Sequence, residues 1–343
     1  MRVALVTPIA FPSVRGNAVT VGRLCQGLRS RGVAADVVDL SRVAPEALGE
    51  RLDAFRPDLV HAFHAFRGAP AVRPFAGAHR LPLVVSLTGT DANIDLFHPQ
   101  RREATIVSIR EASALVAFHE TIRAKVARAV PEAAARIEII PQSVTLGDEP
   151  YDGSALVPRN PGEVRFLLPA GIRRVKNVLF PLGPLGRLAG RYPLRLLIVG
   201  PILEADEGRR LVEALKGAEW ATYLGEVPHG QMGSLLDQSD VVVNSSQSEG
   251  GMANSVLEAM ARRRPVLASD IEGNRSVIES EIDGLLFTGE ADFQREAERL
   301  CRDPALRARL GAAGRAKVER LYPPSREIDA HLALYGRLVG ARP

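Results

Sequence analysis

Short apolar runs alternate with amphipathic segments along the chain, and this alternation predicts its elements. The first apolar run, residues 3–6, is followed by a loop through Gly16 and then by apolar residues at helical spacing up to Gly32. The same order of strand, loop and helix then repeats. Strands that are apolar on both faces and separated by helices predict a parallel, doubly wound sheet. The further elements expected in this half are a helix over about 46–55 and strands at 36–40, 59–63, 83–87, 114–118 and 137–140.

Residues 146–163 interrupt this pattern. They are rich in Gly, Asp, Ser and Pro and have no periodicity, which is typical of a linker. A second alternating series follows the linker, so the chain contains two successive α/β halves. The strands expected in the second half are 165–168, 194–199, 222–224, 241–244 and 265–268.

These halves predict two Rossmann-like domains that face a cleft. The N-terminal domain is expected over 1–145 and the C-terminal domain over 164–322. The tail, 323–343, is helical in pattern and is expected to cross back to the N-terminal domain. A chain of 343 residues is about twice the length of an ordinary domain, which agrees with this division.

Composition narrows the class of protein. With 46% hydrophobic residues the chain can form a real core, and its two distant cysteines, Cys25 and Cys301, offer neither a disulfide framework nor a zinc site. The net charge of +4 is spread without basic blocks, so a nucleic-acid partner is not expected. Neither a signal peptide nor a membrane span is expected. We expect a soluble cytoplasmic protein for which peripheral contact with a membrane is permitted.

Two loops that follow strands are candidate anion sites. Residues 12–17, with Gly16, open onto a helix whose N-terminal amides suit an anion, but a single glycine is not a dinucleotide fingerprint. An ordinary turn is the alternative. The second loop, residues 171–177, carries Arg173 and Lys176, a guanidinium fork and one of only four lysines, which together suit a diphosphate. Its alternative is a solvated basic surface.

The third and strongest candidate runs from residue 244 to residue 260. A strand leads into a polar, glycine-containing loop and then into a helix that is expected to start near Asn254 and to carry Glu258 in about its first turn. Glycines allow close approach to a ligand, the helix N-terminus favours phosphate, and Glu258 could accept hydrogen bonds from a ribose diol. The alternative is a capped helix with an acidic start. The candidate ligand-binding residues are Glu249, Gly250, Gly251, Met252, Ala253, Asn254 and Glu258.

In the N-terminal half, Asp91 ends the segment Leu-Thr-Gly-Thr-Asp on the cleft side of the fourth strand. It is a candidate ligand contact, and a helix-capping role is the alternative. His61 and His64 lie three positions apart, so strand alternation places them on opposite faces and they are not a metal pair. His119 follows another strand and is interpreted as structural.

Together these motifs resemble the donor site of retaining glycosyltransferases of family 4, which have the GT-B fold. The resemblance covers nearly the whole chain and is greatest to the "glycosyltransferase 1 domain-containing" group. It is looser to selenosugar synthases, which share the Asn-x-Val-Thr start and the Leu-Thr-Gly-Thr-Asp segment. It implies a hexosyltransferase-like enzyme whose donor is a nucleoside-diphosphate sugar, expected to be UDP-linked. The acceptor is left open as a small molecule, a glycan or a lipid-linked molecule.

The resemblance also implies roles for individual residues. Arg173 and Lys176 match the pair that binds the donor diphosphate, and Glu258 matches the glutamate that holds the ribose. Glu249 matches the glutamate that contacts the transferred sugar, and the backbone amides of 250–254 match those that hold sugar and phosphates. The loop at Gly16 matches one that closes over the donor. Asp91 lies near the position of a His or acidic group that often contacts the donor sugar in the family, which makes it the candidate contact for the sugar or the acceptor.

Two departures from the family pattern bear on these roles. Eight residues separate Glu249 from Glu258 instead of the usual seven, so either the doubled glycine forms a bulge or Glu249 is displaced. The basic pair is also closer together than is common, and sugar identity therefore cannot be transferred from the family.

No Asp-x-Asp element or His/Asp cluster suited to Mg²⁺ is found in the sequence, so neither a metal nor another cofactor is expected. The leaving diphosphate would be stabilised by Arg173, Lys176 and the helix start near Asn254. Family resemblance implies retention through front-face attack. A UDP-sugar epimerase on the same fold, a nucleotide-sugar sensor and transfer to a selenium or sulfur acceptor are the alternatives.

Overall fold

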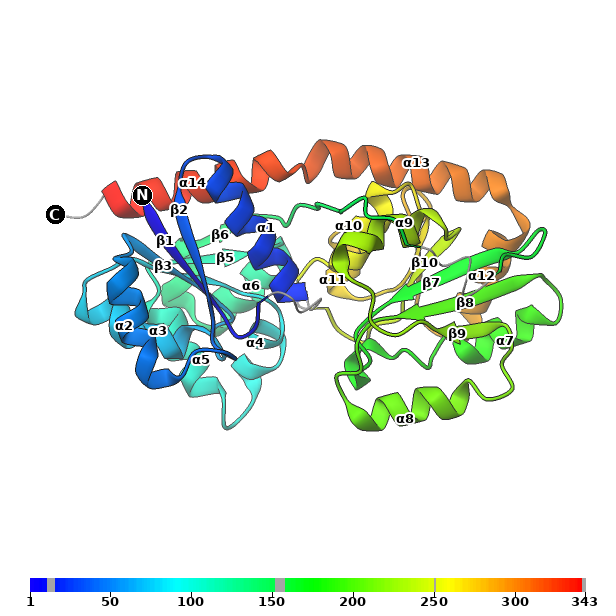
Figure 1. The fold of residues 1–343 in the computed structure, drawn as a ribbon, viewed down its shortest axis with the longest axis horizontal. Helices are drawn as coiled ribbons and strands as arrows, with labels where there is room; N and C mark the ends of the chain where they lie inside the picture. The colour runs from blue at the N-terminus through cyan, green and yellow to red at the C-terminus, as the bar shows by residue number, and fades with distance from the viewer. Residues whose placement is uncertain (11–15, 152–157, 250, 341–343) are drawn as a thin grey trace. The chain divides into compact units, whose positions relative to one another are not determined.

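The computed structural model describes residues 1–10, 16–151, 158–249 and 251–340 (Figure 1). Their contacts divide them into two compact units. The first comprises the described residues within 1–143, 250–252 and 323–343, and the second those within 144–249 and 253–322. Each unit is built around one six-stranded sheet in which every paired strand is parallel. The expected class, two doubly wound α/β halves, is confirmed.

The first unit has the strand order β2-β1-β3-β4-β5-β6. Its strands are short and almost entirely buried because helices cover both faces, which is why they appear in the sequence as continuous apolar runs. The strands are β1 (Arg2–Thr7), β2 (Ala34–Asp39), β3 (Leu59–Phe63), β4 (Leu83–Ser86), β5 (Ala114–Ala117) and β6 (Ile137–Ile139).

Helix α1 leads from β1 out to the edge strand β2, whereas the later crossovers lead the other way across the sheet. Because such crossovers are right-handed, α1 lies on one face and the later helices on the other. Helix α14, from the end of the chain, packs beside α1 (Figure 1). The helices of this unit are α1 (Gly16–Ser30), α2 (Pro45–Phe55), α3 (Ala69–Ala78), α4 (Thr90–Asn93), α5 (Arg102–Glu111), α6 (Glu120–Ala129) and α14 (Pro324–Gly340), with 3₁₀ turns η1 (Asp95–Phe97) and η2 (Pro131–Arg136).

The second unit has the order β12-β11-β10-β7-β8-β9. All of its paired strands are parallel, but the chain adds β8 and β9 on one side of β7 and β10, β11 and β12 on the other, so the order of the strands reverses between β7 and β10. At such a reversal neighbouring loops diverge to opposite faces, which opens a crevice at the carboxyl ends of the strands. The strands are β7 (Val164–Pro169), β8 (Leu194–Val199), β9 (Ala221–Tyr223), β10 (Val241–Asn244), β11 (Val266–Ser269) and β12 (Leu285–Phe287). Strand β12, three residues long, was not predicted.

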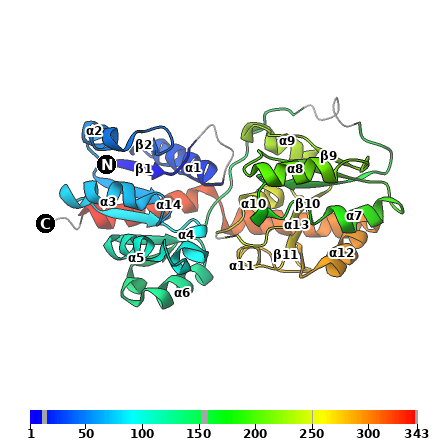
Figure 2. The ribbon, with the colours of Figure 1, turned by 90° about the horizontal axis from the view of Figure 1, so that it is seen from below.

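Helices again lie on both sides of this sheet, as the turned view also shows (Figure 2). Helix α10 packs against α13, and α7 packs against α12. The helices are α7 (Leu182–Ala189), α8 (Ala205–Ala214), α9 (Met232–Asp237), α10 (Asn254–Ala261), α11 (Glu272–Arg275), α12 (Glu290–Arg302) and α13 (Pro304–Leu321), with 3₁₀ turns η3 (Arg174–Lys176) and η4 (His229–Gln231). None of the helices in the described part of the chain combines the length and the apolar character needed to span a membrane.

Candidate functional site

Two of the predicted motifs lie together at the carboxyl edge of the second sheet. The Arg173–Lys176 loop follows β7, and the polar loop that ends at Glu249 follows β10. Since β7 and β10 are paired neighbours, their two loops leave the sheet side by side. The sequence places these motifs about seventy residues apart, and only strand order brings them together.

Hydrogen bonds join the two loops. The amide of Gln247 donates to the carbonyl of Val175 over 2.8 Å, and Ser245 Oγ donates to the carbonyls of Lys176 and Asn177, each at 3.1 Å. The side chains of Lys176 and Glu249 complete the connection as an ion pair. The two motifs therefore form one structural unit.

Glu249 is the centre of this arrangement. Its Oε1 accepts hydrogen bonds from Ser246 Oγ at 2.6 Å and from Asn244 Nδ2 at 3.4 Å, in addition to its pairing with Lys176. Burial by itself raises the pKa of this carboxyl. The nearby ammonium and the three hydrogen bonds together lower the pKa by more than burial raises it, so the pKa lies below its ordinary value. Glu249 is accordingly a carboxylate at neutral pH.

Polar side chains behind the loop hold it in place, and sequence reasoning missed them. Asn274, fully buried, donates to the carbonyl of Ser269 at 2.9 Å and lies 3.4 Å from Asn244 Oδ1. Ser269 Oγ in turn donates to the carbonyl of Ser246 at 2.5 Å. Asn274 lies in the short helix α11, just after a strand that neighbours β10. The signal available in the sequence was an asparagine only a few residues after a predicted strand, 265–268.

Glu258 lies in α10 with its side chain almost fully buried. It is the fifth residue of the helix, so the expectation that it lies in about the first turn is corrected to the second turn. His229 Nε2 lies 3.0 Å from Glu258 Oε1, and His229 begins the turn η4 before α9. Sequence analysis did not select His229, because nothing local connects it to a residue twenty-nine positions away.

The remaining predicted donor-site residues are distributed over both units. Arg173 is half-buried at the residue before η3, and Asn254 is the first residue of α10. Gly251, Met252 and Ala253 are buried just before that helix, whereas Gly250 lies outside the described residues. Gly16 is the exposed first residue of α1, and most of the loop before it, residues 11–15, is also outside the described part of the chain.

Gly200, at the end of β8, has a backbone that only glycine adopts readily, with φ of 144°. A Cβ at this position would lie 2.2 Å from the carbonyl oxygen of Ala170. The chain after β7 therefore passes directly against the chain after β8, and this contact fixes the start of the loop that carries Arg173.

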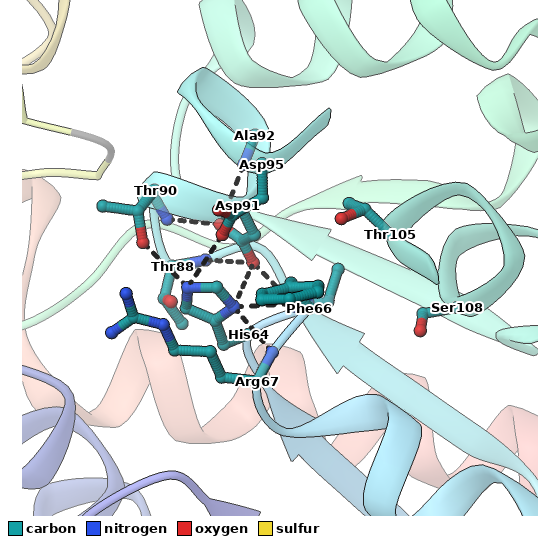
Figure 3. A network of polar contacts seen from close by, with 12 residues as sticks. His64, Phe66, Arg67, Thr88, Thr90, Asp91, Ala92, Asp95, Thr105 and Ser108 are labelled. Carbon is teal, nitrogen blue, oxygen red and sulfur yellow. Dashed lines mark hydrogen bonds and ion pairs between the residues drawn. The ribbon is translucent and has the colours of Figure 1, made fainter. Parts of the chain in front are cut away.

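In the first unit, Asp91 is fully buried behind the loop after β4 (Figure 3). Its carboxylate accepts hydrogen bonds from four backbone amides, those of Ala65, Thr88, Gly89 and Ala92, at 2.7–3.2 Å. A carboxylate can accept about four hydrogen bonds, so these four bonds leave Asp91 little capacity to bind a ligand. The geometry favours the structural alternative for Asp91 over the sugar contact.

His64 occupies the same network (Figure 3) but is not part of the strand, because β3 ends at Phe63 and His64 turns away with φ of 80°. Its Nδ1 accepts from the amides of Phe66 and Arg67, so its proton lies on Nε2, which donates to Thr90 Oγ1 at 2.8 Å. Nε2 is also 3.6 Å from a carboxylate oxygen of Asp95. Both ring nitrogens form hydrogen bonds, so His64 holds together the loops that follow β3 and β4.

His61 points elsewhere, into the first unit's interior. Its Nδ1 lies 2.5 Å from the hydroxyl of Tyr335, and its Nε2 lies 2.8 Å from Ser86 Oγ. The two histidines therefore have separate partners, but strand alternation is not the reason, because His64 lies beyond the end of β3. His119 is buried at the residue before α6. Within the described residues, no three or more His, Cys, Asp or Glu side chains gather as a metal site would require.

Comparison with known proteins agrees with this arrangement. Residues 159–317 match the family described as Glycosyl transferases group 1, and residues 39–147 match Glycosyltransferase Family 4. The chain therefore belongs to the glycosyltransferases with the GT-B fold, and the predicted family is confirmed. It is an enzyme that transfers glycosyl groups.

Among curated proteins, the chain is similar to "Glycosyltransferase 1 domain-containing protein 1" of Xenopus tropicalis. The two are 29% identical over 268 residues, which cover 76% of this chain and 77% of that protein.

Solved structures share the fold. Sucrose-phosphate synthase from Thermosynechococcus elongatus superposes with a TM-score of 0.83 at 18% identity over the full length of both chains. Anabaena Alr3699/HepE, solved with UDP and glucose, superposes with a TM-score of 0.79 at 16% identity over 98% of this chain and 100% of the other. At these identities the likeness establishes the fold alone.

Proposed function

We propose that this glycosyltransferase takes a sugar from a nucleoside-diphosphate sugar, with UDP as the nucleotide, and transfers it with retention and without a metal ion. The acceptor class is a small molecule, a glycan or a lipid-linked molecule. The observation that carries the proposal is the joining of the Arg173–Lys176 loop to the Glu249 loop at the carboxyl edge of β7 and β10. In open α/β sheets this edge is where ligands bind.

Each group has a chemical task in this proposal. Arg173 and Lys176 offer a guanidinium fork and a point charge for the diphosphate. Helix α10 adds the positive end of its dipole at Asn254. Glu258 accepts hydrogen bonds from the ribose diol, and His229, within hydrogen-bonding distance of its Oε1, orients that carboxylate. All of these groups belong to the second unit.

The reaction breaks the bond between the anomeric carbon and the β-phosphate oxygen and forms a bond from that carbon to the acceptor oxygen on the same face of the sugar. The electron pair of the broken bond stays with the phosphate, which takes the acceptor's proton. Fixed positive groups that stabilise the departing phosphate would supply the main electrostatic assistance. The complexes of Anabaena Alr3699/HepE with UDP and with UDP-glucose support a UDP-linked donor for this fold.

Two substitutions test the assignment. Arg173→Ala is expected to lower transfer at least about a hundredfold, the loss typical of removing one group that stabilises a transition state. Glu258→Ala is expected to weaken donor binding and so to lower transfer at subsaturating donor. Activity is read as release of the nucleoside diphosphate from a panel of donor sugars. Glu213→Ala, on the exposed face of α8 in the same unit, is the matched control. Full activity in both site variants, with folding verified by circular dichroism, would refute the donor site.

Incubation with each UDP-sugar alone separates transfer from epimerisation, because an epimerase changes the sugar without a second substrate. Adding selenophosphate tests a selenium acceptor in the same assay. Tight UDP binding without turnover on any acceptor would instead support a nucleotide-sugar sensor.

A further inference from the structure

The ammonium that the proposed diphosphate site needs is already paired with a carboxylate of the chain. Lys176 Nζ contacts Glu249 Oε1, and the side chains of the two residues are only 17% and 12% exposed. An ion pair so largely removed from water is stronger than one on the surface, because the local dielectric constant is lower. Any phosphate that binds Lys176 must share it with Glu249 or displace Glu249.

Glu249 does not depend on Lys176 alone. Ser246 Oγ and Asn244 Nδ2 donate to the same oxygen. If the ammonium turns toward a phosphate, the carboxylate keeps two hydrogen bonds and stays in place. Its negative charge then lies next to the phosphate that Lys176 binds, and like charges at this distance repel.

The donor and the product nucleoside diphosphate interact differently with the negative charge of Glu249. A nucleoside-diphosphate sugar brings hydroxyl groups, which can donate to a carboxylate, and its β-phosphate carries one charge fewer because the sugar esterifies it. The free nucleoside diphosphate has lost those hydroxyls and has gained a negative charge. Glu249 therefore opposes the product more than the donor.

We propose that Glu249 is a specificity-determining residue that competes with the product diphosphate for Lys176 and thereby favours binding of the donor and release of the product. The inference rests on the proposed function of the same site. It gives Glu249 a task that requires its charge, beyond a hydrogen bond to the transferred sugar.

The test is Glu249→Gln, which keeps the shape and the hydrogen-bond acceptor and removes the charge. By isothermal titration calorimetry, UDP should bind roughly tenfold more tightly than to the wild type, the factor that about 1.4 kcal/mol of removed repulsion produces. UMP, which lacks the β-phosphate, should bind unchanged and shows that the variant is folded. In turnover, inhibition by added UDP should become correspondingly stronger.

Two controls isolate the mechanism. Glu213→Gln removes an equal charge from the exposed face of α8 and should leave UDP affinity unchanged. In a Lys176→Met background, UDP should bind more weakly. Glu249→Gln should then regain only the part of the affinity that comes from direct repulsion between the carboxylate and the phosphate, because the contested ammonium is gone. Retention of the full tenfold gain in that background would overturn the competition.

Unchanged or weaker UDP binding by Glu249→Gln would overturn this inference alone. Failure of the wild type to bind UDP, GDP or ADP would instead refute the proposed nucleotide site, so the two failures are distinguishable.

Discussion

Asp91 shows how strongly surroundings decide the role of one residue. A carboxylate at the end of a strand, on the edge where ligands bind, fits a sugar contact from sequence. In the fold, its two oxygens accept hydrogen bonds from four backbone amides, and no part of the residue is exposed. Glu249 is the opposite case, since its partners are side chains and one of them is the lysine that the diphosphate needs.

Asp91→Ala should therefore lower stability first and activity only as a consequence. Each buried amide left without an acceptor costs about 1–3 kcal/mol, so we expect a loss of about 3 kcal/mol or more in the free energy of unfolding. Urea unfolding followed by circular dichroism measures it. Thr90→Val, which removes one hydroxyl from the same turn, is the milder control. A variant with unchanged stability that has lost transfer would show that Asp91 touches substrate.

At the scale of elements, helix α14 is fixed to α1 by a buried ion pair. Arg23 donates through Nε and Nη2 to the two carboxylate oxygens of Glu327, at 2.8 and 3.1 Å, and Ser143 also donates to Glu327. Burial raises the pKa of Glu327, but its polar neighbours, led by Arg23 and including Ser143, together outweigh burial, so the pKa lies below its ordinary value. The last helix is thus joined to the first by an arginine–carboxylate fork nearly closed to solvent.

Glu327→Ala should loosen α14, because it leaves the buried guanidinium of Arg23 unpaired, a change that typically costs about 3–5 kcal/mol. Limited proteolysis should cut the α14 segment faster, and urea should unfold the variant at lower concentration. The matched control is Asp329→Ala on the same helix, which breaks the exposed pair with Arg31 and should change little. Equal effects of the two substitutions would contradict the role of the buried pair.

At the scale of the molecule, buried histidines connect stability to pH. His61 and His331 lie within the first unit, beside Tyr335, with ring centroids 5.7 Å apart. Burial lowers the pKa of His61 well below 6.5, and the neighbouring His331 lowers it further. Burial also lowers the pKa of His331, an effect that Glu327 only partly offsets. The folded protein therefore keeps both imidazoles neutral.

Below pH 6.5 the unfolded chain binds protons that the folded chain does not, so stability should fall as pH falls and should be flat above that value. The expected slope is up to about 1.4 kcal/mol per pH unit for each histidine that stays neutral. Urea unfolding between about pH 5 and pH 7.5 measures this slope, which His61→Gln should reduce. Constant stability across the range would contradict buried, neutral histidines.

The local pattern of apolar and polar residues predicted most of the fold and part of the candidate site. The runs around 3–6, 59–63 and 241–244 predicted strands, because strands covered on both faces must be apolar throughout. Polar loops after β7 and β10 identified Arg173, Lys176, Glu249 and Glu258 as candidates, because ligand groups gather where parallel strands end. These features are visible in sequence since each depends on residues that are neighbours along the chain.

Tertiary structure alone decided which of these residues meet. The pairing of β7 with β10 joins Lys176 to Glu249, and folding brings His229 to Glu258. It also surrounded Asp91 with amides and His61 with Tyr335. No periodicity encodes such contacts, because hydrogen bonds and ion pairs depend on distance in space, and strand order sets that distance for residues far apart in the chain.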